Sequence, residues 1–422
     1  MAVRWLARAM RWFVRAIGIA ATAAVVGCAS SGSLDTARDQ FLHGSHDEAL
    51  RTLSEADVAQ RDQLLLYLER GLIAQAAGDY DQSIDAFARA DEIIDELDYL
   101  SVGDTGSALL VNDSLSRYRG EYAERLWLNT HQMMNFLLAG RPEGAAVEAR
   151  RALPLFKKHG DVLDADVFTR ALMALSFEAA GQYDSAGVEW RRLRKQQGKT
   201  PAQGGDASAN IASTAGSNGG NTRSPDDAEL ILFIRTGLIP RKISSHLLVG
   251  ATDQIAFPGY IKTYDTTPRV SIHEPDTGND SLPIDLWQSD FAALARASLD
   301  KRGAAIVARQ AARVALKHEI GNQIAGEDEV AGDIARLLLF ILERADTRSW
   351  RTLPGAMTLV RLRLPPGDHE LLLELEGHGI AVGGYWQLPI STRLESGERR
   401  YLLVGPNLPQ PGHDVVEVDH SL

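Results

Sequence analysis

The chain has 422 residues, of which 45% are hydrophobic and 24% are charged, a composition typical of globular proteins and a length suited to two or three domains. Its net charge of −12 at pH 7 argues against nucleic acid as a partner, because phosphate binding requires clustered Lys and Arg. The single cysteine, Cys28, excludes a disulfide framework and any zinc site made of several cysteines.

The first 27 residues have the layout of a secretory signal peptide. Residues 1–15 carry four arginines and no acid, and residues 16–27 form an apolar core that is too short to span a bilayer with these flanks. The basic front is long, and a start at Met10 instead of Met1 would give a more usual signal length. After this segment, no apolar stretch reaches the roughly 18 residues that predict a membrane span.

The apolar core ends in Val25-Val26-Gly27-Cys28, which resembles the lipobox of bacterial lipoproteins. In that motif, small residues admit the signal peptidase, and the cysteine thiol receives a diacylglycerol before cleavage. We therefore expect lipid attachment at Cys28, against the alternative of a stray cysteine behind a plain membrane anchor. No aspartate follows the cysteine, which by resemblance to sorted lipoproteins favours the periplasmic face of the outer membrane.

Residues 28–197 are predicted to form a helical repeat domain, because residue types recur 34 positions apart. The paired positions are Ala37, Gly44, His46, Ala49, Leu53 and Ala56 in the first copy and Gly71, Gly78, Tyr80, Ser83, Phe87 and Ala90 in the second. This period resembles that of the tetratricopeptide repeat, in which a glycine turns the chain and an aromatic residue wedges against the neighbouring helix. Gly140 and Gly181 predict two further helical hairpins.

Two features of this helical half each allow two interpretations. The insert at residues 97–120 is expected to be a surface loop, and the alternative is a segment that lines the concave face, where such solenoids hold partners. Basic residues gather at 150–151, 157–158 and 191–195. We expect them to complement the negative ends of helices, and the alternative is a site for an anionic ligand.

The composition changes sharply after the helical half. Residues 198–228 are rich in Gly, Ser, Ala, Asn and Thr, which predicts a flexible linker that leaves each half to fold by itself. Residues 229–422 are predicted to form an α+β domain with an antiparallel sheet. Strands are expected at 229–234, 242–249, 254–258, 269–273, 358–364, 370–375, 381–390 and 400–404, and helices at 289–319 and 327–345. A hairpin-type turn is expected at Pro365-Pro366.

No complete catalytic or metal-binding motif is present in the sequence. Ser298 and Lys301 match the SxxK pattern of penicillin-binding proteins, but the two companion boxes are not both found in order. The histidines are scattered, and His273 beside Glu274 does not give two ligands on one face. We therefore expect no catalytic residues, no metal and no cofactor.

The most distinctive polar and aromatic cluster is Arg348-Ser349-Trp350-Arg351. We expect it to connect a helix to a strand, with Trp350 in the core and Arg348 bonded to main-chain carbonyls. The alternative is a recognition surface, since Trp and Arg often anchor protein interfaces.

Three stretches, at residues 118–153, 229–242 and 345–366, resemble a family of uncharacterised bacterial lipoproteins with tetratricopeptide-like helices. Genes of that family tend to lie near small lipoproteins that activate penicillin-binding proteins, which implies a place in the cell envelope. The resemblance supplies no catalytic residues.

The sequence thus predicts a non-enzymatic outer-membrane lipoprotein that acts as a periplasmic scaffold for a protein partner, with a role in cell-envelope assembly. The alternative is a hydrolase or transferase that acts on envelope polymers, with its site in the C-terminal domain.

Overall fold

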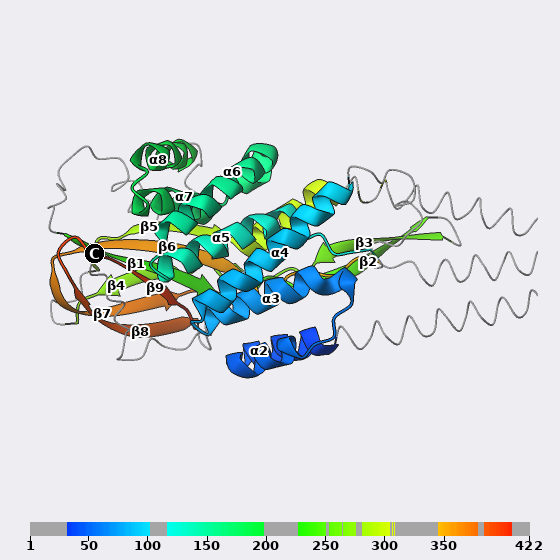
Figure 1. Cartoon of the computed structure of the whole chain (residues 1–422), viewed down its shortest axis with the longest axis horizontal. Helices are drawn as coiled ribbons and strands as arrows, with labels where there is room; N and C mark the ends of the chain where they lie inside the picture. Colours follow the sequence, from blue (N-terminus) through cyan, green and yellow to red (C-terminus); the bar gives the residue numbers. More distant parts are fainter. Residues whose placement is uncertain are drawn as a thin grey trace, which may run out of the picture.

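The computed structural model describes residues 32–101, 116–197, 227–249, 253–263, 265–275, 281–303, 306, 308, 345–378 and 384–406. These residues form three layers, in which helices cover one face of a four-stranded sheet and a three-stranded sheet covers the other (Figure 1). The α+β class predicted from the sequence is confirmed. Cys28, most of the predicted linker (198–226) and the predicted helix at 327–345 up to residue 344 lie outside the described residues.

The helical layer is a series of hairpins. After helical residues 32–42, its elements are α2 (His46–Ser54), the 3-10 turn η1 (Gln60–Asp62), α3 (Gln63–Ala76), α4 (Tyr80–Ser101), α5 (Tyr122–Leu138), α6 (Pro142–Leu163), α7 (Val167–Ala179) and α8 (Tyr183–Gln197). The predicted glycine turns are confirmed, since Gly44, Gly78, Gly140 and Gly181 all have φ between 69° and 82°. Glycine adopts this left-handed conformation without the steric cost of a Cβ atom.

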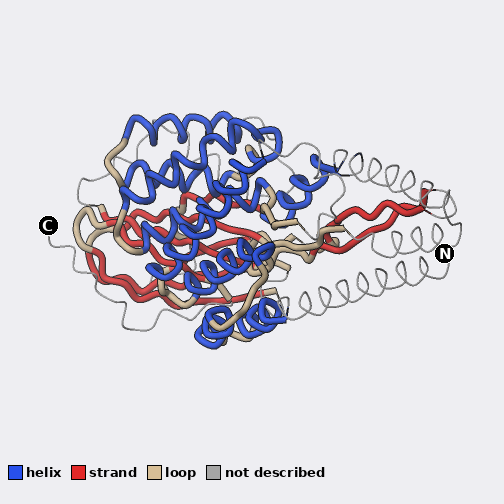
Figure 2. Tube along the Cα trace, turned by 45° about the vertical axis from the view of Figure 1, so that its right-hand side comes forward, coloured by secondary structure: helices blue, strands red, loops and turns tan. Residues whose placement is uncertain are grey.

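The strands form two stacked sheets and a separate ribbon (Figure 2). They are β1 (Ala228–Thr236), β2 (Lys242–Val249), β3 (Asp253–Tyr260), β4 (Arg269–His273), β5 (Asp285–Asp290), β6 (Ala356–Leu364), β7 (Gly367–Glu376), β8 (Tyr385–Leu394) and β9 (Arg399–Val404). The four-stranded sheet has the order β5-β6-β1-β9 and the three-stranded sheet the order β4-β7-β8, while β2 and β3 pair in a ribbon that projects from the body.

Three sequence predictions about the strands are wrong. The four-stranded sheet is mixed, because β9 runs parallel to β1; it enters this sheet from β8 of the other sheet through a short connection at 395–398. Pro365-Pro366 is not a hairpin turn but a corner, since β6 and β7 belong to different sheets. Residues 289–290 end strand β5 rather than begin a helix; the helical residues start at 291, where the Asp290 carboxylate accepts the Ala293 N–H at 2.7 Å.

Strand β1 lies at the centre of the molecule and is buried along its whole length. Its side chains alternate between the two interfaces: Leu230 and Leu232 pack in the core between the sheets, and Ile231 and Phe233 pack against the helices. This alternation follows from the period of two residues in a strand. One sheet therefore contributes to both cores.

The core beneath the helices contains residues from both halves of the chain. Phe87 of α4 is fully buried, and its ring packs edge-on against Trp350, with centroids 5.5 Å apart. A Cβ atom at position 71 would lie 2.6 Å from the Phe87 ring, so Gly71 makes room for it. The apolar face of the helices is covered by side chains of the sheet and by Trp350 and Leu353, which precede strand β6. This shared core contradicts the expectation that each half folds by itself.

We predict that Phe87→Ala destabilises helices and sheet together. The cavity left by the ring should lower the free energy of unfolding by about 3–5 kcal/mol. It would open beside Trp350, which packs on Phe87 and precedes β6 in the chain. Far-UV circular dichroism during thermal unfolding gives the stability change, and hydrogen exchange of β1 amides gives the coupling. Unchanged exchange in β1, with faster exchange in α4, would show that the layers unfold separately.

Candidate functional site

The inner face of the helical layer is filled by the protein's own chain. Trp350 is fully buried there, with its ring 5.5 Å from that of Phe87 and 5.6 Å from that of His131. The prediction that Trp350 belongs to the core is confirmed. The alternative, a recognition surface at residues 348–351, cannot include Trp350, because this side chain is not exposed. The face of the helical layer that lies toward the sheet is thus occupied by the protein's own chain.

Two buried carboxylates hold the main chain of this segment. Glu69 of α3 accepts the N–H groups of Arg351 and Thr352 at 3.0 and 3.2 Å. Glu124 of α5 accepts the N–H of Trp350 at 2.9 Å. We call Glu69 and Glu124 the main-chain clamp.

Other side chains complete the surroundings of the clamp. Arg38 neutralises Glu69 at 2.6 Å, and the Tyr118 hydroxyl donates to Glu124, whose pKa is raised by burial. From the sheet side, Arg235 of β1 donates to the Thr352 carbonyl at 3.3 Å. Arg235 is itself buried, and this burial lowers its pKa to about 10.

Arg348 fastens the beginning of the same segment. Its guanidinium donates to the main-chain carbonyls of Arg61 and Ser116 at 3.2 and 2.9 Å, so the predicted bonding to carbonyls is confirmed. It also pairs with Asp62 and Asp346, each at 2.8 Å. Burial alone would lower the pKa of Arg348, but these two carboxylates outweigh that effect and raise it.

We predict that Glu69→Gln is strongly destabilising. The new amide cannot neutralise Arg38, and its NH₂ group would face main-chain donors, so the free energy of unfolding should fall by about 3–5 kcal/mol. The matched control is Asp81→Asn, because Asp81 pairs with Arg141 on the surface, with 83% of its side chain exposed. The control should change stability by at most ~1 kcal/mol. Urea unfolding measures both variants, and equal losses would contradict a clamping role for Glu69.

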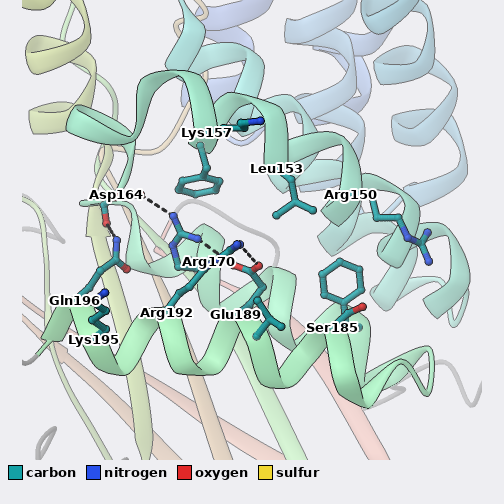
Figure 3. Close-up of a pocket in the computed structure, with 13 residues that line it drawn as sticks. Arg150, Leu153, Lys157, Asp164, Arg170, Ser185, Glu189, Arg192, Lys195 and Gln196 are labelled. Carbon is teal, nitrogen blue, oxygen red and sulfur yellow. Dashed lines mark hydrogen bonds and ion pairs between the residues drawn. The ribbon is translucent and has the colours of Figure 1, made fainter.

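An open pocket lies at the other end of the helical layer, between α6, α7 and α8 (Figure 3). Its volume is about 730 Å³. The lining residues are Arg150, Leu153, Phe156, Lys157, Asp164, Arg170, Phe177, Ser185, Val188, Glu189, Arg192, Lys195 and Gln196. We call this site the α6–α8 pocket. Five of these residues are cationic and two are acidic, so the lining has an excess of positive charge.

Two of the cations in this pocket are neutralised within it. Arg170 is nearly fully buried and pairs with Glu189 at 3.0 Å and with Asp164 at 2.6 Å. Arg192 pairs with the same Glu189 at 2.5 Å. The Arg170 guanidinium also stacks 4.1 Å above the Phe156 ring. These contacts fix the floor of the pocket before any ligand arrives.

The other three cations form no ion pair with the part of the chain that the structure describes. Among the described residues, no carboxylate lies within ion-pair distance of Arg150, Lys157 or Lys195. Arg150 donates instead to the neutral Gln182 side chain at 2.6 Å. The pocket therefore offers three cations whose charge can be neutralised by a ligand.

The structure corrects the interpretation of the basic groups. Arg194 and Lys195 lie in the last turn of α8, and Lys157 lies two residues before the kink of α6 at His159. Complementing a helix end therefore does not explain Arg150 or Arg192. One or more residues from each group meet in the pocket, while Arg151 points away to Asp91. The sequence contains a signal for this arrangement: Arg150, Leu153 and Lys157 are spaced three and four residues apart, which places their side chains on one face of α6. Arg170, Phe177 and Glu189 were missed, although Arg170 and Phe177 have the same seven-residue spacing as Arg150 and Lys157.

A second cavity, of about 520 Å³, lies between the helix turns and the four-stranded sheet. Its charged groups neutralise one another: Glu229 of β1 is buried and pairs with Arg361 and with Arg399, the latter at 2.6 Å. Burial raises the pKa of the neighbouring Tyr401 to about 12. This cluster joins the strands to one another and leaves little charge for a ligand.

The remaining sequence candidates do not form a site. Ser298 is fully buried and Lys301 pairs with Asp161, so the SxxK residues do not present a nucleophile. His273 lies 3.3 Å from Glu374 in the adjacent strand. In the described part of the chain, no three His, Cys, Asp or Glu side chains gather as metal ligands. Among the described helices, none has both the length and the hydrophobicity that a membrane crossing requires.

No protein-family model, no curated protein and no solved structure matches the chain. The resemblance to the lipoprotein family remains a prediction from the three sequence stretches.

Proposed function

We propose that the protein is a non-enzymatic lipoprotein of the outer membrane, anchored through Cys28, that binds a protein partner in the periplasm and serves as a scaffold in the cell envelope. The observation that carries this proposal is the α6–α8 pocket, which combines unneutralised cations with apolar walls. The inner face of the helical layer is covered by residues 350–352, which the main-chain clamp holds, so the pocket is the better place for a partner.

The surface around the pocket supports a protein partner. Val188 of α8 lines the pocket and is a large apolar side chain that is exposed to solvent, and Leu153 and Phe156 of α6 add to the apolar lining. Interfaces commonly combine such apolar groups with arginine at their centre. A free inorganic anion would not require the apolar part of this surface.

The finer description of the fold belongs to the same proposal: a tetratricopeptide-like array joined by a linker to an α+β domain. The glycine turns and the 34-residue spacing from Gly44 to Gly78 support the repeat. The alternative of an envelope-polymer hydrolase or transferase has less support, because the buried Glu229 and its neighbours in the sheet are held in ion pairs.

The anchor is tested by Cys28→Ala. Without the thiol there is no acceptor for the diacylglycerol, so the precursor should stay unprocessed in the inner membrane. Labelling with a radioactive fatty acid and fractionation of membranes measure both effects. A variant that is cleaved normally and still sediments with outer membranes would exclude the lipoprotein assignment.

The pocket is tested by photo-crosslinking in intact envelopes, with the crosslinking residue at Val188. The wild type should give a discrete crosslinked protein, and Arg150→Glu with Lys195→Glu should abolish it because the cations become acidic. The control, Arg393→Glu, reverses a cation on β8 whose side chain is 78% exposed, and it should leave the crosslink unchanged. Equal crosslinking in all three proteins would exclude the pocket as the partner site.

A further inference from the structure

The walls of the α6–α8 pocket are two helices that run in the same direction. At one end, Arg150 of α6 bonds Gln182, which precedes α8. At the other end, Gln196 of α8 bonds the carbonyl of Asp164, which follows α6, at 2.8 Å. Helices α6 and α8 therefore run parallel along the groove, so that residue numbers increase in the same direction on both walls, as Figure 3 shows.

The cations stand at the two ends of this groove. Arg150 and Lys157 are seven residues apart on α6, a rise of about 10 Å along the helix, and Lys195 of α8 lies at the same end as Lys157. Leu153 and Phe156 occupy the wall between Arg150 and Lys157. A ligand that fits should carry two anionic groups about 10 Å apart, with an apolar group between them.

The width of the groove favours an extended chain over a helix. Both α6 and α8 pack on α7, and packed helices have axes 8–10 Å apart, so the axes of α6 and α8 are separated by at most about 20 Å. Subtracting one helix diameter of 10–12 Å leaves at most about 10 Å. An α-helical ligand needs all of that space or more, whereas an extended chain fits within it.

We infer that the α6–α8 pocket binds an extended acidic segment of the partner protein, with two carboxylates three residues apart and an apolar residue between them. In a polyproline II chain, side chains at i and i+3 lie on the same face, about 9 Å apart, which is close to the rise of about 10 Å between Arg150 and Lys157 along α6. One carboxylate bonds Arg150, and the other lies between Lys157 and Lys195. This inference rests on the proposed function, since it names the chemistry of the partner at that site.

The inference is tested with synthetic peptides and the full chain in detergent, by fluorescence anisotropy. The reference peptide has a proline-rich frame with two glutamates at i and i+3 and one leucine between them. Comparison peptides place the glutamates at i and i+1, at i and i+6, or at i and i+7 of a helical frame, and one replaces both glutamates by glutamine. The i,i+3 peptide should bind at least tenfold more tightly than each of the others.

Variants of the pocket assign the contacts. Arg150→Gln and Lys157→Gln should each weaken binding of the i,i+3 peptide at least fivefold. The control is Lys158→Gln, because Lys158 adjoins Lys157 in sequence but does not line the pocket, and it should leave the affinity unchanged. Affinity that is independent of glutamate spacing, tighter binding of the helical i,i+7 peptide, or an equal effect of Lys158→Gln would overturn the inference.

The same measurements separate this inference from the proposed function. If the crosslink at Val188 depends on the pocket cations but the peptides show no preference for i,i+3, the partner site stands and the peptide assignment is wrong. If the crosslink does not depend on those cations, the pocket is not the partner site and the proposed function itself is wrong.

Discussion

Two buried carboxylates impose the arrangement of the whole molecule. Glu69 and Glu124 lie out of reach of water, and a buried charge is tolerated only when donors and a counter-charge surround it. Three of those donors come from the main chain of residues 350–352. The helices therefore have an unsatisfied inner face until this segment is in place, and because the segment leads directly into β6, its binding also fixes the sheet against the helices.

The two ends of the helical layer differ in how far their charges are neutralised within the chain. At the clamp, every buried charge that holds the segment is neutralised or hydrogen-bonded within the chain. In the α6–α8 pocket, Arg150, Lys157 and Lys195 keep their charge for a ligand, while Arg170 and Glu189 stiffen the floor. The clamp and the proposed binding site thus lie in separate regions, so substitutions of the exposed cations in the pocket should leave the core undisturbed.

The sequence predicted the local features well and the long-range ones poorly. Glycine turns and the apolar run of β1 depend on neighbouring residues, so their patterns were sufficient. Strand β5 (Asp285–Asp290) has too many polar residues to be predicted as a strand from its sequence. It is a strand because it pairs with β6. Periodicity indicates that Phe87 is buried but not that Trp350 covers it. For the same reason, the basic groups on α6 and α8 were noticed but their meeting in one pocket was not.

The clamp has a consequence for the order of events during biosynthesis. Glu69 and its partner Thr352 are separated by 283 positions, and synthesis proceeds from the N-terminus. The helices leave the ribosome long before their donors exist, and closing so large a loop delays the rate-limiting contacts. During that interval the inner face of the helices exposes apolar surface and two acids that lack their main-chain donors from residues 350–352. A holding chaperone that recognises such a face would therefore be needed most while residues beyond 197 are still being made, and no longer once Trp350 has entered.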